Sequence, residues 1–243
     1  PAVRAALACR PRSQRLNAKA HVPATPPPGC GVAVFDLDGT ITHHDTLVPY
    51  LRHVLRRYPA RCSALLRVPA ALLVFAVTRD RGDLKARLIR AVMGGLDRAA
   101  VHDLTRDFLD LKLGALCRRT ALGAIEAHRA AGDHLVLLSA STDFYVTEIG
   151  RRLGFDDTVC TEVLLAGDTL VGSLASANRR GEEKRRVIEQ LRQEHPGQAI
   201  AAYGNSASDL PHLEVAEHPL LVNGSARARR RAAALGIPCA DWP

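Results

Sequence analysis

One segment constrains the fold of this chain more than any other. Residues 31–35, Gly-Val-Ala-Val-Phe, form a short apolar run that stops abruptly at Asp-Leu-Asp-Gly-Thr, residues 36–40. The run is typical of a buried parallel strand, and the alternation of side chains then places Asp36 and Asp38 on the same side of the chain. Ligands of open α/β sheets bind just beyond the carboxyl ends of strands, and Gly39 permits a tight turn there. We therefore expect a ligand site at this strand end.

The two acids of this segment need an explanation, because close carboxylates repel each other. Keeping both at neutral pH requires a cation or unlike roles for the two groups. The simpler alternative is a strand followed by an acidic turn, since Asp-Gly is common in turns. The rest of the chain favours the first interpretation.

Three later segments carry polar residues where a strand ends or a helix begins. They are Ser139-Ala140-Ser141 after the apolar residues 134–138, Lys184 in the helix opened by residues 178–184, and residues 204–209 after the apolar residues 199–203. Each alone is typical of ordinary turns or of a solvated helix charge. Their order along the chain is therefore a more specific signal than any one of them.

In this order the four segments resemble the four motifs of the haloacid dehalogenase superfamily. Residues 36–40 match its first motif, DxDGT, and residues 204–209 match its fourth, GDSxxD, except at Asn205. Ser139 and Lys184 match the single polar residues of the second and third motifs. The resemblance extends from residue 31 to about residue 224, and within the superfamily it points to the subfamily with a helical cap.

This resemblance implies an α/β fold, a Rossmann-like parallel sheet with helices on both faces, plus an inserted all-helical cap domain. We expect residues 31–46 and 121–243 to form the core and residues 47–120 the cap. Residues 1–30 contain a Pro-Pro-Pro run and no long apolar periodicity, so we expect a disordered extension.

The resemblance also implies a role for each matched residue. Asp36 is expected to be the nucleophile, forming an aspartyl-phosphate, while Asp38 protonates the leaving alcohol and then deprotonates the attacking water. Ser139 and Lys184 are expected to hold the transferring group. The other expected substrate or phosphate contacts are Gly39, Thr40, which orients the turn, Ala140 and Asp45.

Mg²⁺ is the cofactor that the resemblance implies, bound by the Asp36 carboxylate, the Asp38 carbonyl, and Asn205 or Asp209. Asn205 stands where the family has an acid, and its amide oxygen suits Mg²⁺ but adds no charge. Three interpretations stay open: a working site with weaker metal binding, a site in which Asp209 supplies the acid, and a site that has lost activity. The first is favoured because the other catalytic groups are intact.

The long insertion after the first motif is expected to be helical, over residues 47–58, 63–77, 83–93, 98–113 and 122–131. It resembles the cap of phosphoserine phosphatase, which excludes water and selects the leaving group. Asp45 aligns with a glutamate that recognises the amino acid in that enzyme. It equally suits the N-cap of the helix that begins near Leu47.

Residues 68–77 are apolar on all sides and follow five arginines, Arg52, Arg56, Arg57, Arg61 and Arg67. This stretch is too short to span a bilayer, which needs about 20 residues. It either lies in a membrane interface, with arginines on lipid phosphates, or forms a buried cap helix with a basic outer face. An apolar, arginine-flanked cap resembles that of bacterial phosphatidylglycerophosphatases of the same superfamily.

The net charge of +8 is regional. Residues 1–30 contribute +5 and residues 50–120 contribute +9, whereas the remainder contributes −6. The positive charge thus belongs to the expected extension, which has the alternative interpretation of an organellar transit peptide, and to the expected cap. An anionic substrate or membrane is the expected partner, and no nucleic acid is expected.

The six cysteines are scattered without a metal-binding or disulfide pattern, which favours a reduced compartment. We expect a cytoplasmic protein, with peripheral contact at the inner face of a membrane if the apolar stretch lies in the interface.

The predicted function is that of a Mg²⁺-dependent phosphomonoester hydrolase, an enzyme that acts through an aspartyl-phosphate on a lipid phosphate such as phosphatidylglycerophosphate. Phosphoserine phosphatase or another small-metabolite phosphatase is the alternative. A non-catalytic phosphate-binding or regulatory protein is the alternative of another class, and measured release of phosphate separates it from the enzymes.

Overall fold

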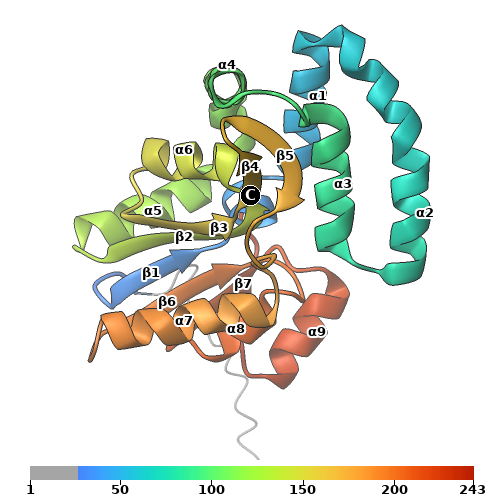
Figure 1. Ribbon diagram of the computed structural model, residues 1–243. Helices are drawn as coiled ribbons and strands as arrows, with labels where there is room; N and C mark the ends of the chain where they lie inside the picture. Colours follow the sequence, from blue (N-terminus) through green and yellow to red (C-terminus); the bar gives the residue numbers. More distant parts are fainter. Residues whose placement is uncertain (1–26) are drawn as a thin grey trace, which may run out of the picture.

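The computed structural model describes residues 27–243, and a six-stranded parallel sheet lies at its centre (Figure 1). In spatial order the strands are β3 (Asp157–Thr161), β2 (His134–Thr142), β1 (Gly31–Phe35), β6 (Ala199–Gly204), β7 (His218–Val222) and β8 (Cys239–Ala240). The expected apolar strands β2, β1 and β6 are therefore three neighbouring strands of the interior of the sheet. Phe35 at the end of β1 pairs with Leu137 on one side and Tyr203 on the other, so the polar residues that follow these strands meet at one edge.

Helices cover both faces of the sheet, as the sequence predicts. One face carries α5 (Arg119–Ala130) and α6 (Asp143–Leu153), and the other carries α7 (Glu182–Glu194), α8 (Leu210–Glu214) and α9 (Ala226–Ala234). The side chains of β1 alternate between these layers. Phe35 joins the core cluster of α5 and α6, whereas Val34 joins that of α7. Burial on both faces explains why the strand is a continuous apolar run.

The expected extension lies almost wholly outside the described residues, since residues 1–26 are not among them. Its last residues are held at the start of β1. The Asp133 carboxylate accepts hydrogen bonds from the backbone N–H of Gly29 at 2.8 Å and of Gly31 at 2.7 Å. Hydrogen bonds to the core are thus present from Gly29 onward, and the predicted boundary at residue 30 stays a prediction.

A buried polar network ties this end of β1 to its neighbours. His128 contacts Asp133 through Nδ1 at 2.6 Å and the Tyr203 hydroxyl through Nε2 at 2.7 Å. With Cys30, His128 and Asp133 form the one group of three close metal-ligand types found in residues 27–243. Both ring nitrogens already have partners, so the network stabilises the fold and leaves no nitrogen for a metal.

The insertion between β1 and β2 is helical, as predicted. It contains α1 (Leu47–Arg57), the 3₁₀ helix η2 (Pro59–Arg67), α2 (Val68–Thr78), α3 (Arg81–Met93) and α4 (Arg98–Leu116). The chain leaves and re-enters the core at one place, because the N–H of His43 bonds the carbonyl of Leu116 at 2.9 Å and the N–H of Arg118 bonds that of Ile41 at 2.8 Å. The division into core and cap at residues 47 and 120 stays a prediction.

A hairpin that the sequence analysis did not predict reaches from the core to these helices. It consists of β4 (Val163–Ala166) and β5 (Thr169–Leu174), joined by Gly167-Asp168, a dipeptide typical of two-residue hairpin loops. Gly172 of β5 has φ +86°, and a Cβ atom there would lie 2.5 Å from the backbone of Arg90 in α3. The hairpin therefore packs closely on α3.

The apolar stretch lies on the outside of the molecule, at the right of Figure 1. Residues Pro59–Thr78 form 20 consecutive helical residues, the one segment of the described chain long and apolar enough to cross a membrane by length and composition. Leu66 is 83% exposed, Leu73 70% and Val77 81%, whereas Ala71 packs inward against α3. The alternative of a buried cap helix was wrong, and the helical segment is longer than the ten residues considered, because η2 continues into α2.

Candidate active site

The turn after β1 brings the first two acids into one cavity. Asp36 continues the strand, with its N–H bonded to the carbonyl of Tyr203 at 3.0 Å. Gly39 then takes φ +83°, and a Cβ atom at this position would lie 2.0 Å from the side-chain nitrogen of Asn205. Glycine is thus required both by the backbone and by the close approach of the fourth motif. Thr40 is buried and donates to Asp36 Oδ2 at 2.7 Å, which orients the carboxylate.

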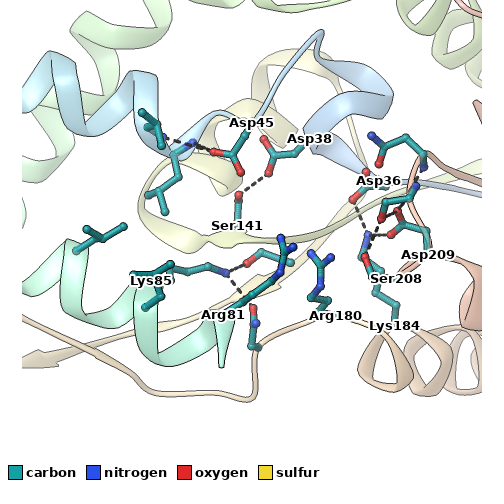
Figure 2. Close-up of a pocket in the computed structure, with 18 of the residues that line it drawn as sticks. Asp36, Asp38, Asp45, Arg81, Lys85, Ser141, Arg180, Lys184, Ser208 and Asp209 are labelled. Carbon is teal, nitrogen blue, oxygen red and sulfur yellow. Dashed lines mark hydrogen bonds and ion pairs between the residues drawn. The ribbon is translucent and has the colours of Figure 1, made fainter. Parts of the chain in front are cut away.

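Lys184 joins the first and fourth motifs at the centre of the site (Figure 2). Its Nζ lies 2.5 Å from Asp36 Oδ1 and 2.7 Å from Asp209 Oδ1, and all three groups are buried. Burial lowers the pKa of Lys184, but the two carboxylates outweigh it and the net shift is upward. The lysine is therefore held as a cation.

The two carboxylates beside Lys184 are shifted in opposite directions. Burial raises the pKa of Asp36, Lys184 opposes this and the charge of Asp209 adds to it, so that the pKa reaches about 7. Burial also acts to raise the pKa of Asp209, but Lys184 and His212 outweigh it and the net shift is downward. One ammonium thus compensates one carboxylate almost fully, which leaves Asp36 as the group whose charge depends on what else enters the site.

Asp38 lies on the same cavity wall and is fully engaged by hydrogen-bond donors. Its Oδ1 accepts from the N–H and the hydroxyl of Thr46, each at 2.7 Å, and its Oδ2 accepts from Ser141 Oγ at 2.5 Å. Burial is the largest influence on the pKa of Asp38 and raises it. A raised pKa is what a carboxyl group needs to donate a proton near neutral pH.

The second motif differs in detail from the expectation. Ser139 is fully buried behind the cavity, where its Oγ accepts from the Ser141 N–H at 3.0 Å. The cavity wall at this strand end consists of Ala140 and Ser141. Ser141, which the sequence analysis did not select, is thus the serine whose hydroxyl contacts Asp38. Two serines that flank one alanine cannot be told apart by sequence position alone.

The fourth motif wraps around Asp209. Its Oδ2 accepts from the N–H of Ser206 at 2.9 Å, from Ser206 Oγ at 2.6 Å and from the N–H of Asn205 at 3.3 Å. The Asn205 side chain lies over Gly39, and no hydrogen bond to its amide group is found among the described residues. Its carbonyl oxygen is therefore available.

These residues suit a magnesium ion. Oxygen donors of Asp36, Asn205 and Asp209 line one cavity, and the carbonyl of Asp38 belongs to the same turn. A set made only of carboxylate, amide and carbonyl oxygens matches the preference of Mg²⁺. The predicted ligands are thus close together, and their role as ligands stays a prediction.

The cavity has a volume of about 350 Å³ and lies between the helical insertion and the edge of the sheet. Its core wall carries the residues described above with Arg180. Its other wall comes from α1, α2 and α3 and carries Leu47, Val48, Phe75, Arg81, Leu84, Lys85 and Leu88. The insertion therefore supplies the surroundings of whatever is attached to the reacting group.

Asp45 lies in the cavity and also caps α1. Its Oδ1 accepts from the N–H groups of Leu47 at 3.0 Å and of Val48 at 3.4 Å. The helix-capping interpretation is therefore confirmed. A role in substrate binding stays a prediction and rests on the other carboxylate oxygen.

Comparison with known proteins identifies the family. Residues 33–214 match the model of the haloacid dehalogenase-like hydrolases. The chain belongs to this family. The predicted family and the prediction of a hydrolytic enzyme are thereby confirmed.

Several known proteins resemble this haloacid dehalogenase-like hydrolase along most of their length. Protein CicA of Caulobacter vibrioides is 31% identical over 188 residues, which cover 76% of this chain and 83% of the relative. A probable phosphatase of Mycobacterium tuberculosis is 27% identical over 219 residues, 88% of this chain and 76% of the relative. A crystal structure of a Bordetella pertussis protein of unknown function shares the fold with a TM-score of 0.72 and 21% identity, covering 86% of this chain and 97% of that one.

Proposed function

We propose that this hydrolase cleaves phosphate monoesters, that it requires Mg²⁺, and that it acts through an aspartyl-phosphate on Asp36. The observation that carries the proposal is the placement of Asp36 against Lys184 and Thr40, with Asp38 on the same wall. The relationship to a probable phosphatase of M. tuberculosis supports the reaction class.

The chemistry follows from these positions. Asp36 attacks phosphorus, and as its oxygen bonds to phosphorus the bond to the leaving oxygen breaks. Asp38 gives its proton to that oxygen. Asp38, now a carboxylate, takes a proton from water, and the water oxygen attacks phosphorus to release inorganic phosphate and Asp36. Lys184 supplies a fixed positive charge beside the transferring group.

When bound, Mg²⁺ supplies further positive charge against the phosphoryl oxygens. Asp36, the Asp38 carbonyl, Asn205 and Asp209 would hold it. Its charge favours the ionised form of Asp36, whose pKa of about 7 in the metal-free site would otherwise leave part of the nucleophile protonated at neutral pH.

Asp36→Asn tests this proposal. The variant keeps the shape of the side chain but cannot form an acyl phosphate, so Mg²⁺-dependent hydrolysis of p-nitrophenyl phosphate should fall to background while circular dichroism stays unchanged. Asp103→Asn, an exposed acid of α4, is the matched control and should keep full activity. Undiminished turnover by Asp36→Asn would contradict the proposal.

Asn205→Asp addresses the departure from the family motif. Adding a charge to an oxygen ligand strengthens binding of a hard cation, so the Mg²⁺ concentration for half-maximal activity should decrease. Activity in Asn205→Asp but none in the unaltered chain would favour the regulatory alternative.

We further propose that the substrate is a lipid phosphate such as phosphatidylglycerophosphate, and that the protein is cytoplasmic and docks peripherally on anionic membranes. Support comes from Leu66, Leu73 and Val77, which are exposed on η2 and α2, while Phe75 of α2 lines the cavity. Exposed arginines flank the helical segment at Arg57 and Arg79. Leucines in the acyl region with arginines at the phosphates are typical of interfacial helices.

Vesicle co-sedimentation tests the membrane proposal. Binding is expected to vesicles that contain phosphatidylglycerol and to be weak with phosphatidylcholine alone. The double variant Leu66→Gln/Leu73→Gln should lose binding, whereas Leu111→Gln, an equally exposed leucine of α4, should retain it. Absence of binding by the unaltered protein would contradict the membrane proposal and leave the phosphatase proposal intact.

A further inference from the structure

Three cations line the cavity beside the proposed metal ligands: Arg81 and Lys85 on one side of it and Arg180 between them and Lys184. Arg81 and Lys85 belong to α3 of the helical insertion, and Arg180 precedes α7 in the core. Figure 2 shows their side chains side by side along one wall, with Asp38 and Asp45 across the cavity. Groups from two separate parts of the chain therefore converge on the same space.

None of these three cations forms an ion pair within residues 27–243. Lys85 Nζ donates to the carbonyl of Ala140 and to Asn178 Oδ1, the latter at 2.9 Å. Neither Arg81 nor Arg180 forms an ion pair or a side-chain hydrogen bond anywhere in residues 27–243. By contrast, Arg152 at the surface bonds two carboxylates. Guanidinium groups that face a cavity without a partner are suited to an anionic ligand.

The phosphoryl group itself already has a cation. Lys184 serves the reacting end beside Asp36, and Asp38, the proposed proton donor to the leaving oxygen, stands between that end and the wall of α3. The leaving alcohol must extend past Asp38 toward Arg81 and Lys85. The unpaired cations thus lie where the remainder of the substrate is held.

We propose that Arg81, Lys85 and Arg180 form an anion subsite for the leaving group, so that the preferred substrate is a phosphate monoester whose alcohol carries a second anionic group, a phosphate or a carboxylate. The inference rests on the proposed phosphatase function and narrows its substrate class. Asp38 and Asp45 are the acids across the cavity from them, and one oxygen of Asp45 caps α1. Three cations against two acids leave a net positive charge.

The arrangement also places two of these cations on opposite sides of the boundary between the helical insertion and the core. Arg81 and Arg180 repel each other across this boundary, since burial and then the charge of Arg81 lower the pKa of Arg180, and the charges of Asp209 and Asp36 oppose this shift only in part. An anion between them replaces repulsion with two charge-assisted contacts. A second negative charge on the substrate therefore relieves the repulsion between Arg81 and Arg180.

Four phosphate esters of three-carbon alcohols test the subsite, differing only in the group on the far carbon: hydroxyl, ammonium, carboxylate or phosphate. The expected order of kcat/KM places the two anionic esters at least about tenfold above the hydroxyl ester and the ammonium ester last, because a charged hydrogen bond contributes about one order of magnitude or more. The ester with a second phosphate has two equivalent phosphate groups, so its kcat/KM is divided by two before the comparison. The better anionic ester identifies the preferred group.

Substitutions of the proposed subsite residues test which side chains produce the preference for anionic esters. Arg81→Gln and Arg180→Gln should each lower the ratio of kcat/KM between anionic and hydroxyl esters by about tenfold. Arg81→Glu should favour the ammonium ester relative to the anionic ones, a reversal that loss of folding cannot produce. Arg87→Gln is the matched control, because Arg87 lies on the same helix but pairs with Asp83 at the surface, and its ratio should be unchanged.

The outcomes separate this inference from the phosphatase proposal. Equal turnover of all four esters, or preference for the ammonium ester, overturns the subsite and leaves the phosphatase proposal standing. If none is hydrolysed, the phosphatase proposal fails, and calorimetric binding of the same esters to Asp36→Asn still ranks them. Equal binding there would overturn the subsite as well.

Discussion

The two ends of the cavity differ in whether their charged side chains are paired. At the sheet edge, Lys184 lies within 2.7 Å of two carboxylates, and every charged group has a partner. Arg81 on α3 and Arg180 on the core side of the same cavity form no ion pair or side-chain hydrogen bond among the described residues. The comparison indicates that the reacting end is organised by the fold itself, whereas the far end is completed by a ligand.

The largest expected effect comes from removing the cation of the organised end. Lys184→Met leaves Asp36 and Asp209 buried without their counter-charge, so the free energy of unfolding should fall by about 3–5 kcal/mol, and hydrolysis should be lost. Urea denaturation measures the first and p-nitrophenyl phosphate turnover the second. Lys112→Met, an exposed lysine of α4, should change stability by less than about 0.5 kcal/mol. A stable Lys184→Met protein would show that the three groups are not a structural unit.

The far end should depend on pH through Lys85. Burial lowers the pKa of Lys85 from 10.5 to about 8, with Asp38 and Asp45 opposing this shift and Arg180 adding to it. Above pH 8 Lys85 loses its charge in the native protein but keeps it in the unfolded chain, so unfolding is accompanied by uptake of a proton. The free energy of unfolding therefore rises with pH up to about 10.5. The preference for anionic over hydroxyl esters should instead decline several-fold above pH 8.

Steady-state kinetics between pH 6.5 and 9.5 would show that decline as a change in the ratio of kcat/KM. Lys85→Met removes the titrating group and should give a lower ratio that no longer changes near pH 8. Persistence of the change in Lys85→Met would assign it to another group.

A smaller effect distinguishes the two possible roles of Asp45. Asp45→Ala removes the hydrogen bonds to the first turn of α1 and should lower the free energy of unfolding by about 1 kcal/mol, while Asp45→Asn retains a capping oxygen and should be close to neutral. If Asp45 also binds substrate through its charge, Asp45→Asn lowers kcat/KM for the ammonium ester without affecting stability. Thermal denaturation and the ester series separate these results.

The smallest expected effect on stability concerns the outer helices. Leu66→Gln/Leu73→Gln should alter the free energy of unfolding by only about 0.5 kcal/mol per substitution, because both side chains are largely exposed. Ala71→Gln on the same helix forces a polar side chain against α3 and should cost about 1–3 kcal/mol. An equal decrease in the free energy of unfolding for the two variants would show that Leu66 and Leu73 stabilise the fold, which would contradict a role in membrane binding alone.

The parts of the site that could be predicted depend on short sequence patterns at strand ends. Asp36, Asp38 and Asp209 follow buried strands, and parallel strands place such residues at a shared edge, so their convergence was foreseeable from the sequence. Lys184 was foreseeable only through the family motif, since a lysine in a first helical turn is ordinarily solvated. The choice between Ser139 and Ser141 depended on which hydroxyl reaches Asp38, and two serines within the same strand do not reveal this from their positions in the sequence.

By itself, the sequence determined the sheet, its order of motifs and the acids at its edge, because apolar runs and strand-end residues act over a few neighbours in the chain. The tertiary structure alone decided three things: that β4 and β5 pack on α3, that Leu66 and Leu73 stay exposed, and that Arg81 meets Arg180. These depend on how helices of the insertion dock on a core about a hundred residues away in the chain. The periodicity of the sequence does not predict such docking, since a basic or apolar helical face has the same sequence pattern whether it contacts solvent, a membrane or a substrate.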